Sequence, residues 1–274
     1  PYWCGVNSVV ESMRNVAATG ATPHAITDCL CFGNPENPEQ MWQFAEATKG
    51  VADACKGIRL KHNPDHTVPI IAGNVSFYNE SSAGAIPPSP IVSCLGRLSD
   101  VDKAITTGFK KNNSKIMLIG ERKKELGGSL YYSLFNHLGK DLPKPNLDQV
   151  ESEIWALTDL IDNRLVLSAH DISDGGVAIT LSEMSFYNEI GFEVKINSAD
   201  RPDVWLFSET GGFIIELEEN VLPQAQAVMS KYNIHYEEIG ETTQHQAMVF
   251  GEIIHMPILK AKDSWQRSLR NKIQ

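Results

Sequence analysis

Long apolar runs are missing from this sequence of 274 residues. A transmembrane helix needs about 18 or more consecutive apolar residues, so none is predicted and no membrane partner is expected. Residues 1–5 do not place a basic segment before an apolar stretch, so they do not predict a signal peptide. Helical apolar spacing begins almost at once, and we therefore expect the chain to be a piece of a longer protein.

Positive charge is also scarce. The chain has 24 Lys and Arg against 34 Asp and Glu, a formal net charge of −10. A nucleic-acid surface needs cationic side chains to neutralise phosphates, so nucleic acid is excluded as a partner. A small local phosphate site remains compatible with this charge, because backbone amides can bind an anion.

Cysteine is scarce and odd in number, with five in the chain. Scattered, unpaired cysteines are typical of reduced thiols in a cytoplasmic protein. Cys29 and Cys31 are two positions apart, so on a strand their side chains point the same way. A metal site would need further ligands at matching spacing, and there is no second Cys pair. We therefore expect free thiols near a core.

The common nucleotide motifs are absent too. Neither a P-loop nor a G-x-G-x-x-G dinucleotide fingerprint occurs, so those two nucleotide-binding folds are not supported. No Ser/His/Asp or Cys/His set suggests a nucleophile. His170 and Asp171 are adjacent, but neighbours in sequence do not make a catalytic triad.

Apolar periodicity and turn residues indicate alternating helices and strands. Helices are predicted over residues 6–19, 38–55, 129–138, 147–162, 177–185 and 222–232. Strands are predicted over 24–32, 68–72 (buried), 91–95, 115–119, 165–169, 192–196, 213–217 and 234–239, with an exposed loop over 57–67. This order predicts a mixed α/β (α+β) protein with two domains, 1–108 and 109–274.

Helix ends are marked by particular residues. Ser8 and Glu11 have the spacing of a capping box, and Asn37 followed by Pro38 suits an N-cap and a first helical position. Gly20 can take the left-handed conformation that ends a helix.

Four segments combine glycine with Asp, Asn or Ser at the ends of predicted strands: residues 27–36, 73–80, 170–176 and 208–212. Glycine lets a ligand approach the backbone, and the short polar side chains supply oxygen ligands or hydrogen-bond donors. Ligands of α/β proteins commonly lie at strand ends. These segments are therefore the candidate binding loops.

Three side chains in the first two segments suit a nucleotide site. The Asp28 carboxylate and the Asn74 amide oxygen are hard ligands suitable for Mg²⁺, and the Ser76 hydroxyl can donate to a phosphate or an amide. The alternatives are an Asp that caps a turn and a Gly73–Asn74 turn that joins two strands. Local rules alone favour these alternatives.

The other two segments have alternatives of equal weight. The glycines of 170–176 and the start of the helix after them can hold an anion, or Asp174 can simply cap that helix. Residues 208–212 can bind a ligand or form a plain hairpin loop. The roles of both segments stay open.

Taken together, these segments are more specific than any one of them. The order of the motifs resembles formylglycinamidine ribonucleotide amidotransferase, specifically the second half of its synthetase subunit. The resemblance runs from about residue 5 to residue 220 and rests on residues 14–23, 25–28, 32–36, 73–80, 86–92, 126–129 and 170–176. It implies the aminoimidazole ribonucleotide synthetase-like fold: a truncated N-terminal α/β domain of the barrel-forming type and a C-terminal α/β sandwich.

The resemblance also implies an activity. Members of this family are carbon–nitrogen ligases of de novo purine biosynthesis, with ATP and Mg²⁺ as cofactors. They convert formylglycinamide ribonucleotide and glutamine-derived ammonia to formylglycinamidine ribonucleotide. The implied partners are the missing N-terminal half, a glutaminase subunit or domain, and the small nucleotide substrate.

Residue by residue, Asp28 and Gly73 match ATP-binding positions of the family, Asn74 a Mg²⁺ ligand and Ser76 a substrate-binding position. The family's catalytic histidine belongs to a motif of the first half that this chain lacks. No catalytic residue is therefore assigned, and the chain alone is expected to be inactive.

The sequence departs from the family pattern at several places. Cys31 stands where an Asn is usual, Ala72 where a second Gly is common, and Gly212 near a frequent Arg; residues 57–67 look like an insertion. The rival interpretations are another ATP-dependent synthetase or kinase of the superfamily, and a non-catalytic nucleotide-binding scaffold. Convergence of Asp28 and Asn74 on one Mg²⁺-nucleotide would favour catalysis, and separation would favour the scaffold.

Overall fold

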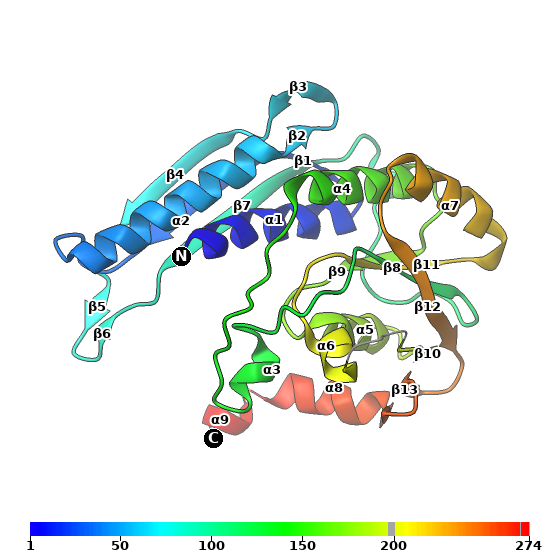
Figure 1. The fold of residues 1–274 in the computed structure, drawn as a ribbon. Coiled ribbons are helices and arrows are strands. Elements are labelled where there is room, and N and C mark those ends of the chain that lie inside the picture. Colours follow the sequence, from blue (N-terminus) through cyan, green and yellow to red (C-terminus); the bar gives the residue numbers. More distant parts are fainter. Residues whose placement is uncertain (197–200, 269, 274) are drawn as a thin grey trace.

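The computed structural model describes residues 1–196, 201–268 and 270–273. Figure 1 shows an elongated arm of strands and two long helices beside a larger body built around a second sheet. This confirms the predicted mixed α/β class. None of the helices in these ranges has the length and hydropathy needed to cross a bilayer.

The arm consists of a three-stranded sheet and two helices. Its strands are β1 (Thr22–Cys31), β4 (Ile70–Ser76) and β7 (Ser89–Arg97), in the order β4-β1-β7. β1 pairs parallel to β4 and antiparallel to β7. Helices α1 (Tyr2–Ala18) and α2 (Pro38–Gly57) lie together against one face of this sheet. The other face is left open.

Sequence signals explain both helices of the arm. Asn37 caps α2 by accepting a hydrogen bond from the Glu39 N–H (2.9 Å), as predicted. Gly20 has φ +91 just beyond α1, which confirms its role in ending that helix. The predicted capping box of Ser8 is wrong, because α1 begins at Tyr2 and Ser8 therefore lies inside it.

The body is built on a seven-stranded sheet in the order β14-β13-β10-β12-β8-β11-β9. Its strands are β8 (Lys115–Ile119), β9 (Ser168–Asp171), β10 (Gly191–Val194), β11 (Phe213–Leu217), β12 (Tyr236–Thr243), β13 (Ala247–Phe250) and β14 (Ile254–Pro257). Its helices are α3 (Leu130–Ser133), α4 (Leu147–Asp162), α5 (Gly176–Phe186), α6 (Pro202–Phe207), α7 (Leu222–Lys231), α8 (Ile258–Arg267) and α9 (Arg270–Ile273).

Alternation along β8 separates two apolar layers. Met117 and Ile119 pack with α4, α7 and the arm helix α1, whereas Ile116 and Leu118 pack with α5, α6 and α8. Because successive side chains of a strand point to opposite faces, one strand serves both layers. The first layer joins arm and body in one core. The predicted domain limit at residue 108 remains a prediction.

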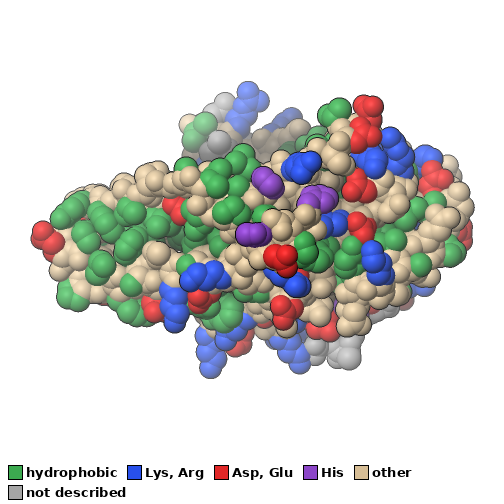
Figure 2. Space-filling model, turned by 90° about the horizontal axis from the view of Figure 1, so that it is seen from above, with side chains coloured by type: hydrophobic (Ala, Val, Ile, Leu, Met, Phe, Trp, Pro, Cys, Tyr) green, Lys and Arg blue, Asp and Glu red, His purple; other side chains and the backbone are tan. Residues whose placement is uncertain are grey.

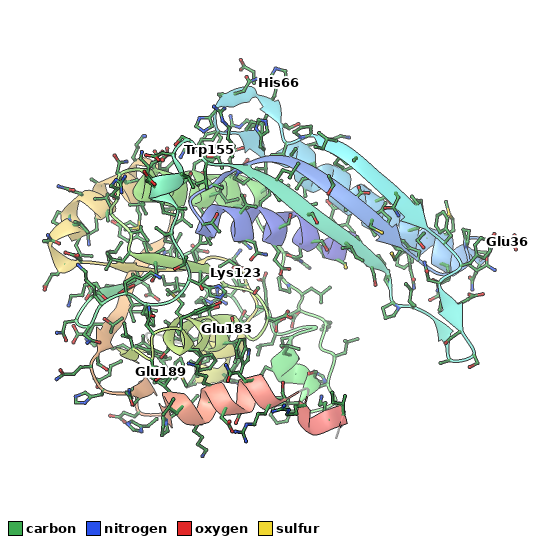
Figure 3. All side chains as sticks on the ribbon, turned by 180° about the vertical axis from the view of Figure 1, so that it is seen from behind. Glu36, His66, Lys123, Trp155, Glu183 and Glu189 are labelled. Atoms are coloured by element: carbon green, nitrogen blue, oxygen red, sulfur yellow. The ribbon has the colours of Figure 1, made fainter. Side chains whose placement is uncertain are left out.

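Residues 57–67 are not the loop that was predicted. They include a hairpin of β2 (Arg59–Leu60) and β3 (Asn63–Thr67) that lies over α4. Lys61 Nζ lies 2.6 Å from Asp159 Oδ1, and the Arg59 backbone N–H donates to Glu151 at 2.6 Å. Figure 3 shows Trp155 of α4 close to the hairpin that carries His66. This hairpin therefore ties the arm to the body.

The strand predicted over 68–72 is buried only at its first residue. Val68 is 2% exposed but precedes β4, whereas Ile70 and Ile71 of β4 are 43% and 57% exposed. β4 is an edge strand, and the arm helices make their contacts mainly with β1 and β7, so its apolar residues have no cover. In Figure 2, hydrophobic side chains gather along the elongated arm.

The helix predicted over 129–138 is much shorter. α3 ends at Ser133, and Asn136 and Gly139 both have positive φ, which a right-handed helix cannot contain. A second hairpin, β5 (Glu80–Ser81) with β6 (Gly84–Ala85), follows the Asn74 segment at the tip of the arm.

Candidate functional site

Two of the four predicted site residues meet where β1 and β4 pair. Asp28 and Gly73 are direct partners in the parallel register. A Cβ atom added at Gly73 would lie 2.2 Å from Asp28 Oδ1, closer than any real contact. Glycine at 73 therefore leaves the room that the Asp28 carboxyl group occupies.

The Asp28 side chain points toward the helices of the arm. Ile26 and Leu30, which share its face of β1, are buried under α1 and α2. Burial raises the pKa of Asp28. Burial and, next, the charge of Asp28 raise the pKa of Cys55 on α2 to about 11. Asp28 is therefore a half-buried carboxylate below the sheet.

The other two predicted residues lie on the open face. Asn74 is the register partner of Cys29, and Ser76 is the partner of Cys31. Asn74 Nδ2 donates to Cys29 Sγ at 3.3 Å, which fixes the amide on that face. Its Oδ1 makes no hydrogen bond within the described ranges and is therefore available to a ligand.

Asp28 and Asn74 consequently point to opposite faces of the sheet, since their β1 register positions are adjacent. Their side chains do not converge on one ion. In the part of the chain that the structure describes, no group of three or more His, Cys, Asp or Glu side chains is arranged to hold a metal. These residues therefore form only one wall of a binding site.

The two polar loops at this end of the sheet are joined to each other. The Phe32 N–H donates to Ser76 O at 2.9 Å, and the Tyr78 N–H donates to Gly33 O at 3.1 Å. The Ser76 hydroxyl lies 3.3 Å from Asn79 Oδ1, to which it can donate, and 3.1 Å from Asn79 Nδ2, from which it can accept. Figure 3 places Glu36 at the far tip of the arm. Ser76 is therefore held in a fixed position at the strand end.

A second polar region lies between α1 and the body, around a cavity of about 520 Å³. Arg14 and Glu153 form a buried ion pair there, with 3.7 Å between Nη2 and Oε2. Arg122 donates to the carbonyl oxygens of Ser208 and Thr210. The 208–212 segment joins α6 to β11, so the plain hairpin alternative is wrong.

The N-terminus of α5 is already occupied by a side chain of the protein. Glu209 accepts hydrogen bonds from the backbone N–H groups of Gly175 (2.9 Å) and Leu130 (2.8 Å). Gly175 is the N-cap, and no side chain caps the helix from that position, so Asp174 does not have the capping role. The Glu209 carboxylate therefore occupies the helix N-terminus at which the sequence suggested a bound anion.

His170 lies between two carboxylates. Its Nδ1 is 3.2 Å from Asp171 Oδ1, and its Nε2 is 3.2 Å from Glu183 Oε2. Burial is the largest single influence and lowers the pKa of His170, but the hydrogen bonds and charges of the two carboxylates together outweigh it and raise the pKa to about 9. The imidazole is therefore a cation at neutral pH.

Two family models match successive parts of the chain. Residues 1–98 match the AIR synthase related protein, N-terminal domain, and residues 111–251 match the AIR synthase related protein, C-terminal domain. The chain belongs to the AIR synthase related protein family. The aminoimidazole ribonucleotide synthetase-like fold expected from the sequence is confirmed.

Individual relatives narrow the resemblance. The chain is 38% identical over 280 residues to phosphoribosylformylglycinamidine synthase subunit PurL of Methanothrix thermoacetophila, covering 100% of this chain and 36% of the relative. Two solved structures, T. maritima PurL complexed with FGAR and with ATP, have TM-scores of 0.75 and 0.70 at 14% and 16% identity. The matches cover 94% and 93% of this chain, and 42% and 40% of the respective PurL chains. The chain therefore spans little more than a third of its relative's length.

The sequence did not predict a buried cluster of charged side chains. Arg14, Arg122 and Glu153 lie far apart in the sequence, and only the fold brings them together. The available signal was Glu153, an acidic residue among the buried positions of α4. A charge on an apolar helix face requires a partner, because an unpaired buried charge is costly.

The stability of this family member is expected to depend on pH through His170. Its pKa in the folded chain lies above the ordinary 6.5, so the stabilisation is complete below pH 6.5 and is lost as pH rises through about 9. One pKa unit corresponds to about 1.4 kcal/mol, and solvent screening reduces the total to roughly 2 kcal/mol. Urea unfolding of wild type and His170→Gln between these pH values measures this loss. A constant difference between the two proteins would contradict it.

Proposed function

We propose that this chain is the second half of the synthetase subunit of a formylglycinamidine ribonucleotide synthase. The whole enzyme would be an ATP-dependent ligase that joins glutamine-derived ammonia to formylglycinamide ribonucleotide. The relative that matches the full length of this chain bears that enzyme's name, and the fold recurs in PurL complexed with FGAR and with ATP. The observation that carries the proposal is the open sheet face on which Asn74 and Ser76 stand.

The residues of this wall fit a Mg²⁺-nucleotide. The free Oδ1 of Asn74 is a hard oxygen ligand of the kind that Mg²⁺ takes, and Ser76 supplies a hydroxyl two residues along the same face. Asp28 and Gly73 are proposed ATP-binding positions on the other side. Because β4 is an edge strand and Gly73 is exposed, a nucleotide lying along the edge reaches both faces.

The chemistry assigned to this chain is binding and orientation. When bound, Mg²⁺-ATP would supply the phosphoryl group that activates the substrate amide. Asn74 would hold the cation and Ser76 would orient the substrate, which places the reacting groups at short range. The catalytic histidine would come from the other half, so this chain alone would be inactive.

The partners follow from the surface that remains open. Ile91 and Leu95 of β7 are 56% and 52% exposed, and register places Ile91 beside Cys29 on the open face. Apolar positions on a sheet face require cover. We propose that the missing N-terminal half supplies it, and that a glutaminase subunit or domain supplies ammonia. The proposed location is the cytoplasm.

The test uses the full-length parent protein and its Asn74→Ala variant. ATP- and ammonia-dependent formation of formylglycinamidine ribonucleotide should fall roughly 100-fold, because the variant loses a cation ligand. Asn63→Ala, at an exposed position of the β3 hairpin, is the matched control and should be fully active. Equal activity of all three proteins would contradict the role of Asn74. A folded parent that forms no product would contradict the enzyme itself.

A nucleotide-binding scaffold is the second candidate, and one observation favours it. Asp28 and Asn74 point to opposite faces, which is the separation expected if this half only binds a nucleotide. In that case Asn74→Ala would reduce the thermal stabilisation of the parent by Mg²⁺-ATP and leave the rate of product formation unchanged.

A further inference from the structure

Two thiols lie side by side on the open face of the arm. The Sγ atoms of Cys29 and Cys31 are 3.6 Å apart, and both side chains are half-buried. Asn74 Nδ2 contacts Cys29 Sγ at 3.3 Å. A pair of sulfur atoms at the surface, one of them in contact with a polar side chain, forms a local donor set that the proposed ligase chemistry does not use.

The spacing of the two sulfur atoms matches that of ligands on one ion. Two thiolates about 2.3 Å from a tetrahedral cation lie about 3.8 Å apart. A disulfide would require the sulfur atoms to approach to about 2.05 Å, a much larger movement. We propose that Cys29 and Cys31 form a two-thiol binding site for a soft, thiophilic divalent cation.

Binding exchanges protons for the cation without electron transfer. Each thiol loses its proton to solvent, two sulfur–cation bonds form, and one cation replaces two protons. Water fills the remaining positions, because the described ranges contain no cluster of three or more His, Cys, Asp or Glu side chains suited to a metal.

The other cysteines provide contrasts within the same chain. Burial raises the pKa of both Cys55 and Cys94 to about 11. The pKa of Cys31 is raised as well, but its first cause is the hydrogen bond with Cys29. Cys4 is exposed, its Sγ donates to the Pro88 carbonyl oxygen at 3.9 Å, and burial raises its pKa. Cys4 is therefore the matched control for a single accessible thiol.

Occupancy of the two-thiol site has a consequence for the neighbouring wall. Register places Cys29 beside Asn74 and Cys31 beside Ser76. A cation between the sulfur atoms removes the contact that orients Asn74 and occupies space on the same face. We expect it to exclude a Mg²⁺-nucleotide, and this expectation rests on the proposed function.

The test titrates Cd²⁺ alone into the 274-residue chain and follows the thiolate-to-cadmium absorption band. Wild type and Cys4→Ser should bind one equivalent with the same affinity, and Cys29→Ser and Cys31→Ser should each bind at least 10-fold more weakly. Unchanged affinity in the last two variants, or no band in the wild type, overturns the site.

A probe on the wild type avoids dependence on the folding of the variants. Phenylarsine oxide joins two neighbouring thiols and releases water. One adduct per chain, with loss of two titratable thiols and mapping to the peptide that holds Cys29 and Cys31, supports the site. Adducts on single thiols elsewhere overturn it.

A nucleotide-binding experiment distinguishes failure of this site from failure of the proposed function. Mg²⁺-ATP should bind at least 10-fold more weakly when Cd²⁺ is present, and this effect should vanish in Cys29→Ser. Cd²⁺ binding with undiminished nucleotide affinity overturns the coupling alone. A full cadmium band in a chain that binds no nucleotide leaves the two-thiol site standing and contradicts the proposed nucleotide site.

Discussion

Replacing Glu216 with Ala is expected to lower the free energy of unfolding by about 4 kcal/mol. Glu216 lies on β11 and is fully buried. One carboxylate oxygen accepts from the Lys110 N–H (2.8 Å) and the Ser168 hydroxyl (2.7 Å). The other accepts from the Lys111 N–H (3.0 Å) and the Ser114 hydroxyl (2.6 Å). Four donors lose their acceptor together.

Urea unfolding followed by circular dichroism measures this effect. Glu218→Ala is the matched control, because Glu218 is a nearby surface carboxylate whose partner is the Lys111 ammonium. An exposed pair contributes at most about 1 kcal/mol, so the control should change little. Equal unfolding midpoints for the two variants would show that the Glu216 network does not hold the connection before β8 to the sheet.

Gly50→Ala is expected to destabilise the protein by about 3 kcal/mol, although alanine is the better helix former by about 1 kcal/mol. A Cβ atom at this position of α2 would lie 2.0 Å from the Tyr2 carbonyl oxygen of α1. The obstacle is backbone, which cannot rotate aside. Accommodation would require the two helices to separate and would disturb the sheet that carries Asp28.

Gly57→Ala in the same helix is the control for this substitution. Its Cβ atom would meet Leu147 Cδ1, the end of a side chain that can change rotamer. Thermal unfolding of both variants is the measurement, and the control should stay within about 1 kcal/mol of the wild type. If both variants are equally stable, the close approach of α1 and α2 does not contribute as the structure indicates.

Local signals predicted much of the fold because their causes are local. The bounds of α4, β8 and β11 agree with those predicted, since strong apolar periodicity depends only on nearby residues. The prediction was wrong where distant contacts decide. The polar segment 57–67 contains a hairpin because α4 offers partners for Lys61, and the apolar residues of β4 stay exposed because no described segment covers that edge.

The family was also determined by the sequence, because the order of its polar glycine-containing segments is specific even where each segment alone is ambiguous. The sites were decided by the tertiary structure. Parallel pairing of β1 with β4 places Asp28 below the sheet and Asn74 above it, and the fold brings Glu209 to the start of α5. The physical reason is that capping and periodicity act over a few residues, whereas the face of a strand and the partner of a charge depend on chain segments far away.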